Sequence, residues 1–121
     1  MCKRFRYLCI SVLLLTIIST GCNSNQREYH ADIRIPLQHN DGIIIVREWS
    51  WLMGSGAEIY WEVDGKITLL GECGRADDGY CPFRDGRYTF EENENEIIFT
   101  WYFNTSADGE EIWHSEAFQL D

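Results

Sequence analysis

Residues 96–104 read EIIFTWYFN, a run of aromatic and β-branched residues with almost no polar interruption. Successive side chains of an extended chain point to opposite faces, so Ile97, Phe99 and Trp101 share one face and the residues between them share the other. A strand that is apolar on both faces is usually buried on both. We therefore expect this segment to be the central strand of a sheet, covered on each side.

Six further segments show the same period of two, and none sustains the 3.6-residue period of a helix. They are separated by Asp-Gly and Asn-rich turns, and by Gly54-Ser55-Gly56, which we expect to be a hairpin loop or a bulge. The expected strands are residues 30–37, 42–52, 57–63, 66–72, 86–92, 96–104 and 111–120. The sequence thus predicts an all-β fold, a small antiparallel meander of about seven strands that closes into a sandwich or a barrel.

The turn at Asp64-Gly65 allows two registers for the hairpin around it. A two-residue turn would set Trp61 opposite Thr68, whereas a three-residue turn with Gly65 in the left-handed conformation sets Trp61 opposite Ile67. The second register pairs apolar side chains with each other, and we expect it for that reason.

The N-terminus has the organisation of a secretion signal. Basic residues at positions 3, 4 and 6 precede an apolar stretch over residues 8–18, and small residues then lead to Cys22. The apolar stretch is shorter than the roughly 20 residues that a transmembrane helix needs. This N-terminal pattern resembles the lipobox of bacterial membrane lipoproteins. The resemblance covers residues 1–22 and implies that residues 1–21 are a cleaved signal peptide and that Cys22 carries the lipid.

Two acyl chains on Cys22 would hold the protein stably at a membrane, on its extracytoplasmic side. Residues 22–28 are then the lipidated cysteine and a polar tether, and residues 29–121 a single β-domain. By the sorting rule of the same family, Asn23 implies the outer membrane in an organism that has two. Residues 49–83 also resemble small uncharacterised bacterial lipoproteins, a resemblance that implies no function.

The mature chain is strongly acidic. Removal of residues 1–21 leaves seven basic and twenty acidic residues, a formal charge of −13 in 100 residues. Such a charge repels nucleic acid and favours either a cationic partner or simple solubility.

Cys73 and Cys81 are the two cysteines left after export and lipidation. They lie eight positions apart in a Gly- and Asp-rich segment, and in an oxidising compartment we expect them to form a disulfide. Two free thiols are the alternative.

Few residues suggest catalysis or metal binding. The three histidines lack the spacing of a zinc site, and no nucleophile elbow is present, so we expect no catalytic residues, no metal and no cofactor. An acidic, glycine-containing segment offers either calcium ligands or an Asp-rich turn, and exposed tryptophans would suit stacking on sugars or anchoring a protein partner. The candidate binding residues are Trp49, Trp51, Asp77, Asp78 and Asp85.

The sequence favours a noncatalytic envelope lipoprotein whose β-domain binds a ligand or a protein, with a glycan or a basic protein as the partner. The alternative is an inhibitor or immunity-type protein that acts on a cationic enzyme or toxin, which the strong acidic charge would suit.

Overall fold

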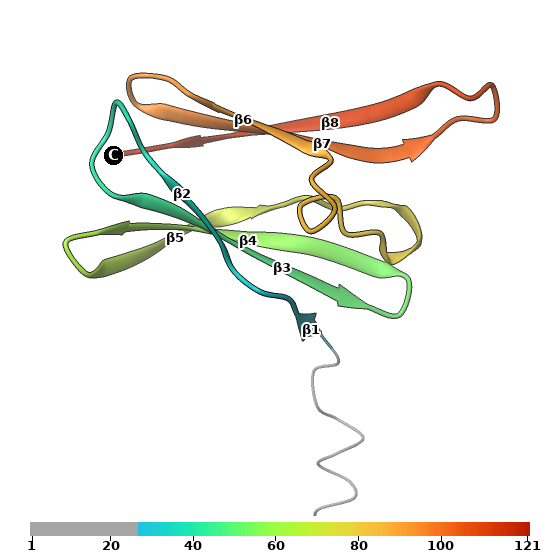
Figure 1. Cartoon of the computed structure of the whole chain (residues 1–121), viewed down its shortest axis with the longest axis horizontal. Helices are drawn as coiled ribbons and strands as arrows, with labels where there is room; N and C mark the ends of the chain where they lie inside the picture. Colours follow the sequence, from blue (N-terminus) through green and yellow to red (C-terminus); the bar gives the residue numbers. More distant parts are fainter. Residues whose placement is uncertain (1–26) are drawn as a thin grey trace, which may run out of the picture.

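The computed structural model describes residues 27–121, which form two antiparallel sheets packed face to face (Figure 1). The predicted all-β class and the meander order are confirmed. Because the two sheets remain separate layers, the fold is a sandwich and not a closed barrel. The signal peptide, Cys22 and all but the last two residues of the tether lie outside the described residues.

Sheet A has five strands and sheet B has three. The strands of sheet A are β1 (Glu28–Tyr29), β2 (Ile33–Pro36), β3 (Ile43–Trp51), β4 (Gly54–Val63) and β5 (Lys66–Cys73). The strands of sheet B are β6 (Tyr88–Glu92), β7 (Glu96–Thr105) and β8 (Glu111–Gln119). Consecutive hairpins join β3 to β5 and β6 to β8, while β1 and β2 both pair with the edge of β3 that β4 leaves open. A one-turn 3-10 helix, η1 (Asp77–Gly79), lies in the connection between the sheets.

The core lies between the sheets and takes side chains from one face of each. Alternation along each strand selects these residues, as the period of two predicts. Its buried members are Ile44, Val46, Ala57, Ile59, Cys73, Phe83, Ile97, Phe99, Trp101, Phe118 and Leu120.

The segment at residues 96–104 is the central strand of sheet B, as predicted, because β7 pairs with both β6 and β8. Its Ile97, Phe99 and Trp101 are at most 5% exposed. The expectation that its second face is also covered is wrong, since Ile98 and Tyr102 on that face are only half-buried. Sheet B has one packed face and one open face, which is common for antiparallel sheets.

The β4–β5 hairpin has the register that we did not expect. Asp64 (φ 51°) and Gly65 (φ 80°) form a two-residue turn with both residues in the left-handed region, and Trp61 pairs with Thr68. A bulge at Leu70 then shifts the pairing, so that Cys73 still reaches the core. Strand alternation cannot reveal such a bulge. The observed register leaves Ile67 and Leu69 56% and 55% exposed on the outer face of the sheet.

The buried carboxylate of Glu48 joins the two layers. Glu48 is 1% exposed and accepts hydrogen bonds from the backbone N–H of Phe83 (2.9 Å) and of Arg84 (2.8 Å). Burial raises the pKa of this carboxyl, and the two hydrogen bonds oppose that shift. Glu48 therefore fixes the segment that leads from η1 into sheet B against β3.

Both cysteines of the described chain are buried free thiols, so the structure does not show the disulfide that we expected. Cys73 lies in the core at the end of β5, and the Cys81 thiol lies 3.7 Å from the carbonyl oxygen of Gly79. Burial raises the pKa of each thiol. Protonated, enclosed thiols react slowly, which gives these residues a packing role.

Candidate functional site

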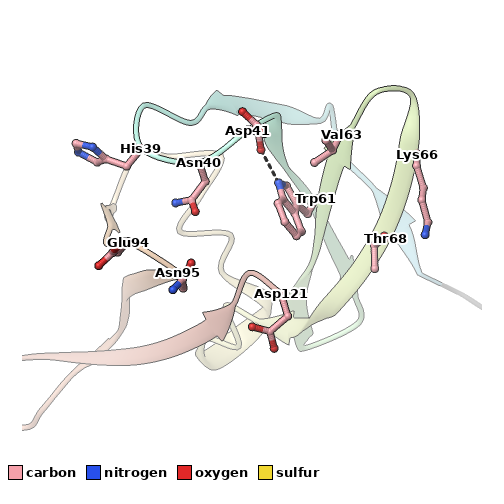
Figure 2. Close-up of a pocket in the computed structure, with 10 residues that line it drawn as sticks. All are labelled: His39, Asn40, Asp41, Trp61, Val63, Lys66, Thr68, Glu94, Asn95 and Asp121. Carbon is pink, nitrogen blue, oxygen red and sulfur yellow. Dashed lines mark hydrogen bonds between the residues drawn. The ribbon is translucent and has the colours of Figure 1, made fainter.

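A cleft of about 550 Å³ opens at one end of the sandwich (Figure 2). It is bounded by the loop before β3, the β4–β5 hairpin, the β6–β7 turn and the last residue of the chain. The lining residues are His39, Asn40, Asp41, Trp61, Val63, Lys66, Thr68, Glu94, Asn95 and Asp121. Its size lies in the range of small-molecule sites.

The loop before β3 and the β4–β5 hairpin, which bound the cleft, lie at the opposite end of sheet A from β1, where the described chain begins (Figure 1). The β1 residues pair with Trp49 and Ser50 near the end of β3, whereas residues 39–41 of the cleft precede its start at Ile43. The nine residues of β3 span eight steps of about 3.3 Å, so roughly 26 Å separates the two ends.

Trp61 forms the aromatic wall of the cleft. Its partner across the hairpin is Thr68, which also lines the cleft, so the observed register puts the two side by side. The ring is half-buried against the core, and its indole N–H donates to the carbonyl oxygen of Asp41 at 2.8 Å. The ring is thus held in one orientation by packing and by a hydrogen bond.

Glu92, at the end of β6, holds the loop that forms the opposite wall. Its carboxylate accepts the backbone N–H groups of Gln38 (2.7 Å), His39 (2.7 Å) and Asn40 (2.9 Å), and the Asn40 side-chain amide (3.0 Å). Desolvation opposes ionisation, but these hydrogen bonds outweigh it and hold the pKa of Glu92 below its usual value. An ionised Glu92 therefore fixes residues 38–40 from sheet B, and two of these, His39 and Asn40, line the cleft.

The chemistry of the cleft is polar and acidic around one ring. Three carboxylates line it, from Asp41, Glu94 and Asp121, with Lys66 as the one ammonium group. Amides, carboxylates and a tryptophan ring together suit a ligand that has hydroxyl or cationic groups and an apolar face. Among residues 27–121, no three His, Cys, Asp or Glu residues come together as a metal site would require.

None of the five binding residues proposed from the sequence lines this cleft. Trp49 is 6% exposed, because its ring packs over Gly56, where an added Cβ would lie 2.7 Å from a ring carbon. This contact explains the need for glycine at position 56. Gly54-Ser55-Gly56 is part of β4 and not the hairpin loop or bulge that we expected. Trp51 is 45% exposed at the end of β3.

The predicted aspartates lie near a second hollow of about 530 Å³, where Asp77 and Asp78 of η1 meet Tyr80 and Tyr102. The Arg87 guanidinium covers the Tyr102 ring at 3.8 Å from its centre. The Asp77 carboxylate already accepts a hydrogen bond from the Asn104 amide. The Tyr102 ring and the Asp77 carboxylate, which could contact a ligand in this hollow, thus already interact with other residues of the protein.

Asp85 does not line this hollow, but its carboxylate contacts Tyr80, which does, and it also pairs with the Arg84 guanidinium at 3.5 Å. Among the five candidate binding residues, Asp77 and Asp78 line the same hollow.

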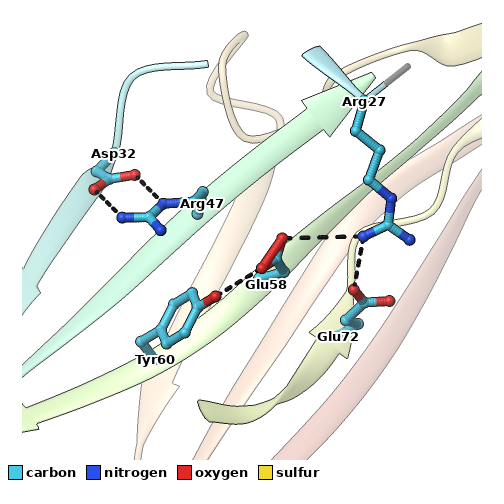
Figure 3. Close-up of polar contacts among 6 residues, drawn as sticks. All are labelled: Arg27, Asp32, Arg47, Glu58, Tyr60 and Glu72. Atoms are coloured by element: carbon cyan, nitrogen blue, oxygen red, sulfur yellow. Dashed lines mark hydrogen bonds and ion pairs between the residues drawn. The ribbon is translucent and has the colours of Figure 1, made fainter. Parts of the chain in front are cut away.

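On the outer face of sheet A, arginine side chains form ion pairs that neutralise several of its carboxylates (Figure 3). Arg47 donates to both oxygens of Asp32 at 3.1 Å, which holds the pKa of Asp32 below its usual value. Arg27 pairs with Glu72 at 3.2 Å and with Glu58 at 4.0 Å, and its guanidinium lies 4.0 Å from the centre of the Trp49 ring. This face is therefore less acidic than its carboxylates alone would make it.

Sequence reasoning missed the cleft because its residues come from four separate segments. The polar run Gln38-His39-Asn40-Asp41-Gly42 was the available signal, since it interrupts two strands with residues that turns favour. The run alone does not show that Trp61 faces it.

Comparison with protein families, curated proteins and solved structures finds no match for this chain. Among residues 27–121, no helix has the length and apolar character needed to cross a membrane.

Proposed function

We propose that the protein is a lipid-anchored lipoprotein of the bacterial cell envelope that binds a glycan, without catalysis, in the cleft around Trp61. The observation that carries this proposal is the position of the cleft. It lies at the far end of sheet A from β1, and the tether from Cys22 leads into β1. A domain anchored through Cys22 can then present the cleft away from its own membrane.

The lipid anchor is supported by the sequence pattern that ends at Cys22. Two acyl chains would anchor the protein stably on the extracytoplasmic surface, and in an organism with two membranes we propose the outer one. The test is expression of the full chain with metabolic labelling by a fatty-acid analogue. We expect label in the membrane fraction, and loss of the label in Cys22→Ser. A labelled Cys22→Ser protein would contradict the anchor.

A glycan suits the cleft because a fixed tryptophan ring can stack on the apolar face of a sugar, while amides and carboxylates hydrogen-bond its hydroxyls. Trp61 supplies the ring, and the Asn95 and Thr68 side chains border it. No set of groups for acid–base or nucleophilic catalysis is needed for such binding.

The test is binding of soluble envelope oligosaccharides to the full-length lipidated protein in detergent micelles. We expect Trp61→Phe and Asn95→Ala each to weaken binding about tenfold, which corresponds to 1.4 kcal/mol. Trp113→Ala is the matched control, because Trp113 is 39% exposed and does not line the cleft. Equal binding by all of these variants would refute the site, and thermal unfolding of each variant checks its fold.

A basic protein is the second candidate ligand, favoured by the excess of carboxylates over ammonium groups in the cleft. This reading includes an inhibitor or immunity-type role against a cationic enzyme or toxin. It predicts binding that weakens steeply with salt and strengthens in Lys66→Glu. The binding of a neutral glycan should change little with salt or in Lys66→Glu. The salt dependence and the effect of Lys66→Glu therefore distinguish the two candidate ligands.

A further inference from the structure

The turn between β3 and β4 presents large apolar side chains to solvent. Leu52 and Met53 form the two-residue turn between the paired Trp51 and Gly54, and they are 83% and 76% exposed. Trp51 beside them is 45% exposed. These three residues, the 51–53 tip, contribute little to the core in their exposed positions.

The residue type at position 52 also does not suit the backbone conformation of the turn. Leu52 has φ 48°, in the left-handed region that Gly, Asn and Asp occupy most easily in hairpin turns. A bulky apolar residue is uncommon there. Neither turn geometry nor core packing accounts for this choice of residues, so a function of the exposed side chains is the remaining physical reason.

The tip lies at the end of sheet A from which the chain enters the domain. The strand β1 runs antiparallel to β3, with Glu28 opposite Ser50, so the chain reaches β1 from the side of the β3–β4 turn (Figure 1). Arg27 holds this entry point against sheet A through Glu72 and the Trp49 ring. The direction in which the domain meets its tether is therefore fixed.

Few residues separate this end of the sheet from the proposed anchor. Six residue steps lead from Cys22 to Glu28, and at about 3.3–3.6 Å each they span roughly 20 Å at most. The tip lies on the same side of the domain as that short connection, and therefore within reach of the lipid surface.

We propose that the 51–53 tip inserts into the interface of the membrane that holds Cys22 and is a second membrane contact beside the lipid anchor. The proposal rests on the lipid anchoring argued above. Tryptophan favours the boundary between headgroups and acyl chains, and leucine and methionine favour the apolar side of it. Two contacts on one end of the domain would orient sheet A and direct the Trp61 cleft outward.

The charges beside the tip indicate which lipids it prefers. The turn η1 packs against the hairpin, where an added Cβ on Gly79 would lie 3.1 Å from the Leu52 carbonyl oxygen. Its Asp77 and Asp78 are exposed. Carboxylates are repelled by anionic headgroups, so insertion should be favoured in zwitterionic phosphatidylcholine over membranes rich in phosphatidylglycerol.

The experiment places an environment-sensitive fluorophore on Leu52→Cys in the full-length lipidated protein, reconstituted into phosphatidylcholine vesicles. The matched control carries the label on Glu94→Cys, an exposed position at the cleft end. The wild-type protein checks that the buried Cys73 and Cys81 thiols remain unlabelled. We expect label 52 to shift its emission to the blue and to be reduced severalfold more slowly by dithionite than label 94.

The outcomes separate the tip from the anchor. If the protein floats with the vesicles but the fluorophore at position 52 is as exposed as the one at position 94, tip insertion is overturned and the lipid anchor stands. Failure of the protein to float would overturn both. Protection of label 52 in whole cells but not on vesicles would assign the tip to a protein partner and so overturn the lipid contact.

A second pair of variants tests the tip without a label on it. Leu52→Asn suits the left-handed conformation of this turn and replaces its apolar side chain. With a label on Met53→Cys, we expect Leu52→Asn to increase the rate of dithionite reduction severalfold. An unchanged rate would contradict a role for the apolar tip even if the protein floats.

Discussion

Glu92 should stabilise the domain and its cleft through the hydrogen bonds that its carboxylate accepts from residues 38–40. In Glu92→Gln, one carboxylate oxygen becomes an amide nitrogen that cannot accept these hydrogen bonds. If the remaining oxygen faces the three donors of His39 and Asn40, the backbone N–H of Gln38 loses its acceptor. The variant also loses the negative charge that strengthens the other bonds.

The expected cost at pH 7 is about 1–2 kcal/mol. A hydrogen bond to a charged group contributes about 1.5–3 kcal/mol, and the partial exposure of Glu92 lets water replace some of what is lost. For a domain of this size, that cost should lower the Tm by roughly 4–16 °C. Thermal unfolding followed by circular dichroism measures the shift, and hydrogen exchange should become faster at the three amides.

The pH dependence gives the sharper check. The folded pKa of Glu92 is lowered, so its stabilisation is complete above the unfolded value of about 4.3 and disappears as the pH falls through the folded pKa. The difference in Tm between wild type and Glu92→Gln should therefore shrink in acid. Glu91→Gln is the control, since this exposed neighbour makes no side-chain hydrogen bond within residues 27–121. A difference that is absent at pH 7, or that grows in acid, would refute the reasoning.

Three further predictions concern the core and the turns. Glu48→Leu leaves two inward backbone N–H groups without an acceptor and should lower the free energy of unfolding by about 2–5 kcal/mol in urea titration; an unchanged midpoint would contradict the role of this carboxylate. Gly65→Ala should cost about 1–2 kcal/mol through its left-handed backbone alone, while Gly74→Ala should cost more, because its Cβ would also lie 2.5 Å from the Phe83 ring. The two buried thiols should resist iodoacetamide in the folded protein and react on unfolding, and rapid native labelling would show that this part of the core opens.

The strands were predictable because alternation is a local property of the chain. Each of the seven expected segments contains a strand, and residues 96–104 form the centre of a sheet as the run of apolar residues indicated. The Asp64-Gly65 turn was located correctly, since both residues tolerate the left-handed conformation. Its register was not, because the bulge at Leu70 depends on what each side of β5 meets in the core.

The candidate site was the least predictable part. Trp49 was a candidate binding residue, but its ring is buried over Gly56 on the next strand. Trp61 received no such role, although it forms the aromatic wall of the cleft. Composition showed that aromatics were abundant, but not which of them the sheets would cover.

The order of residues along the chain was sufficient to establish an all-β domain, the Asp64-Gly65 turn and the acidic charge, since each depends on neighbouring residues or on composition. The sandwich, the covered faces and the cleft depend on contacts between segments distant in sequence, such as Glu92 with residues 38–40. The position of the 51–53 tip beside the entering chain likewise follows from the pairing of β1 with β3. Many arrangements of strands satisfy the same local pattern, and packing between the two layers selects one of them. The candidate site could therefore be identified only in the tertiary structure.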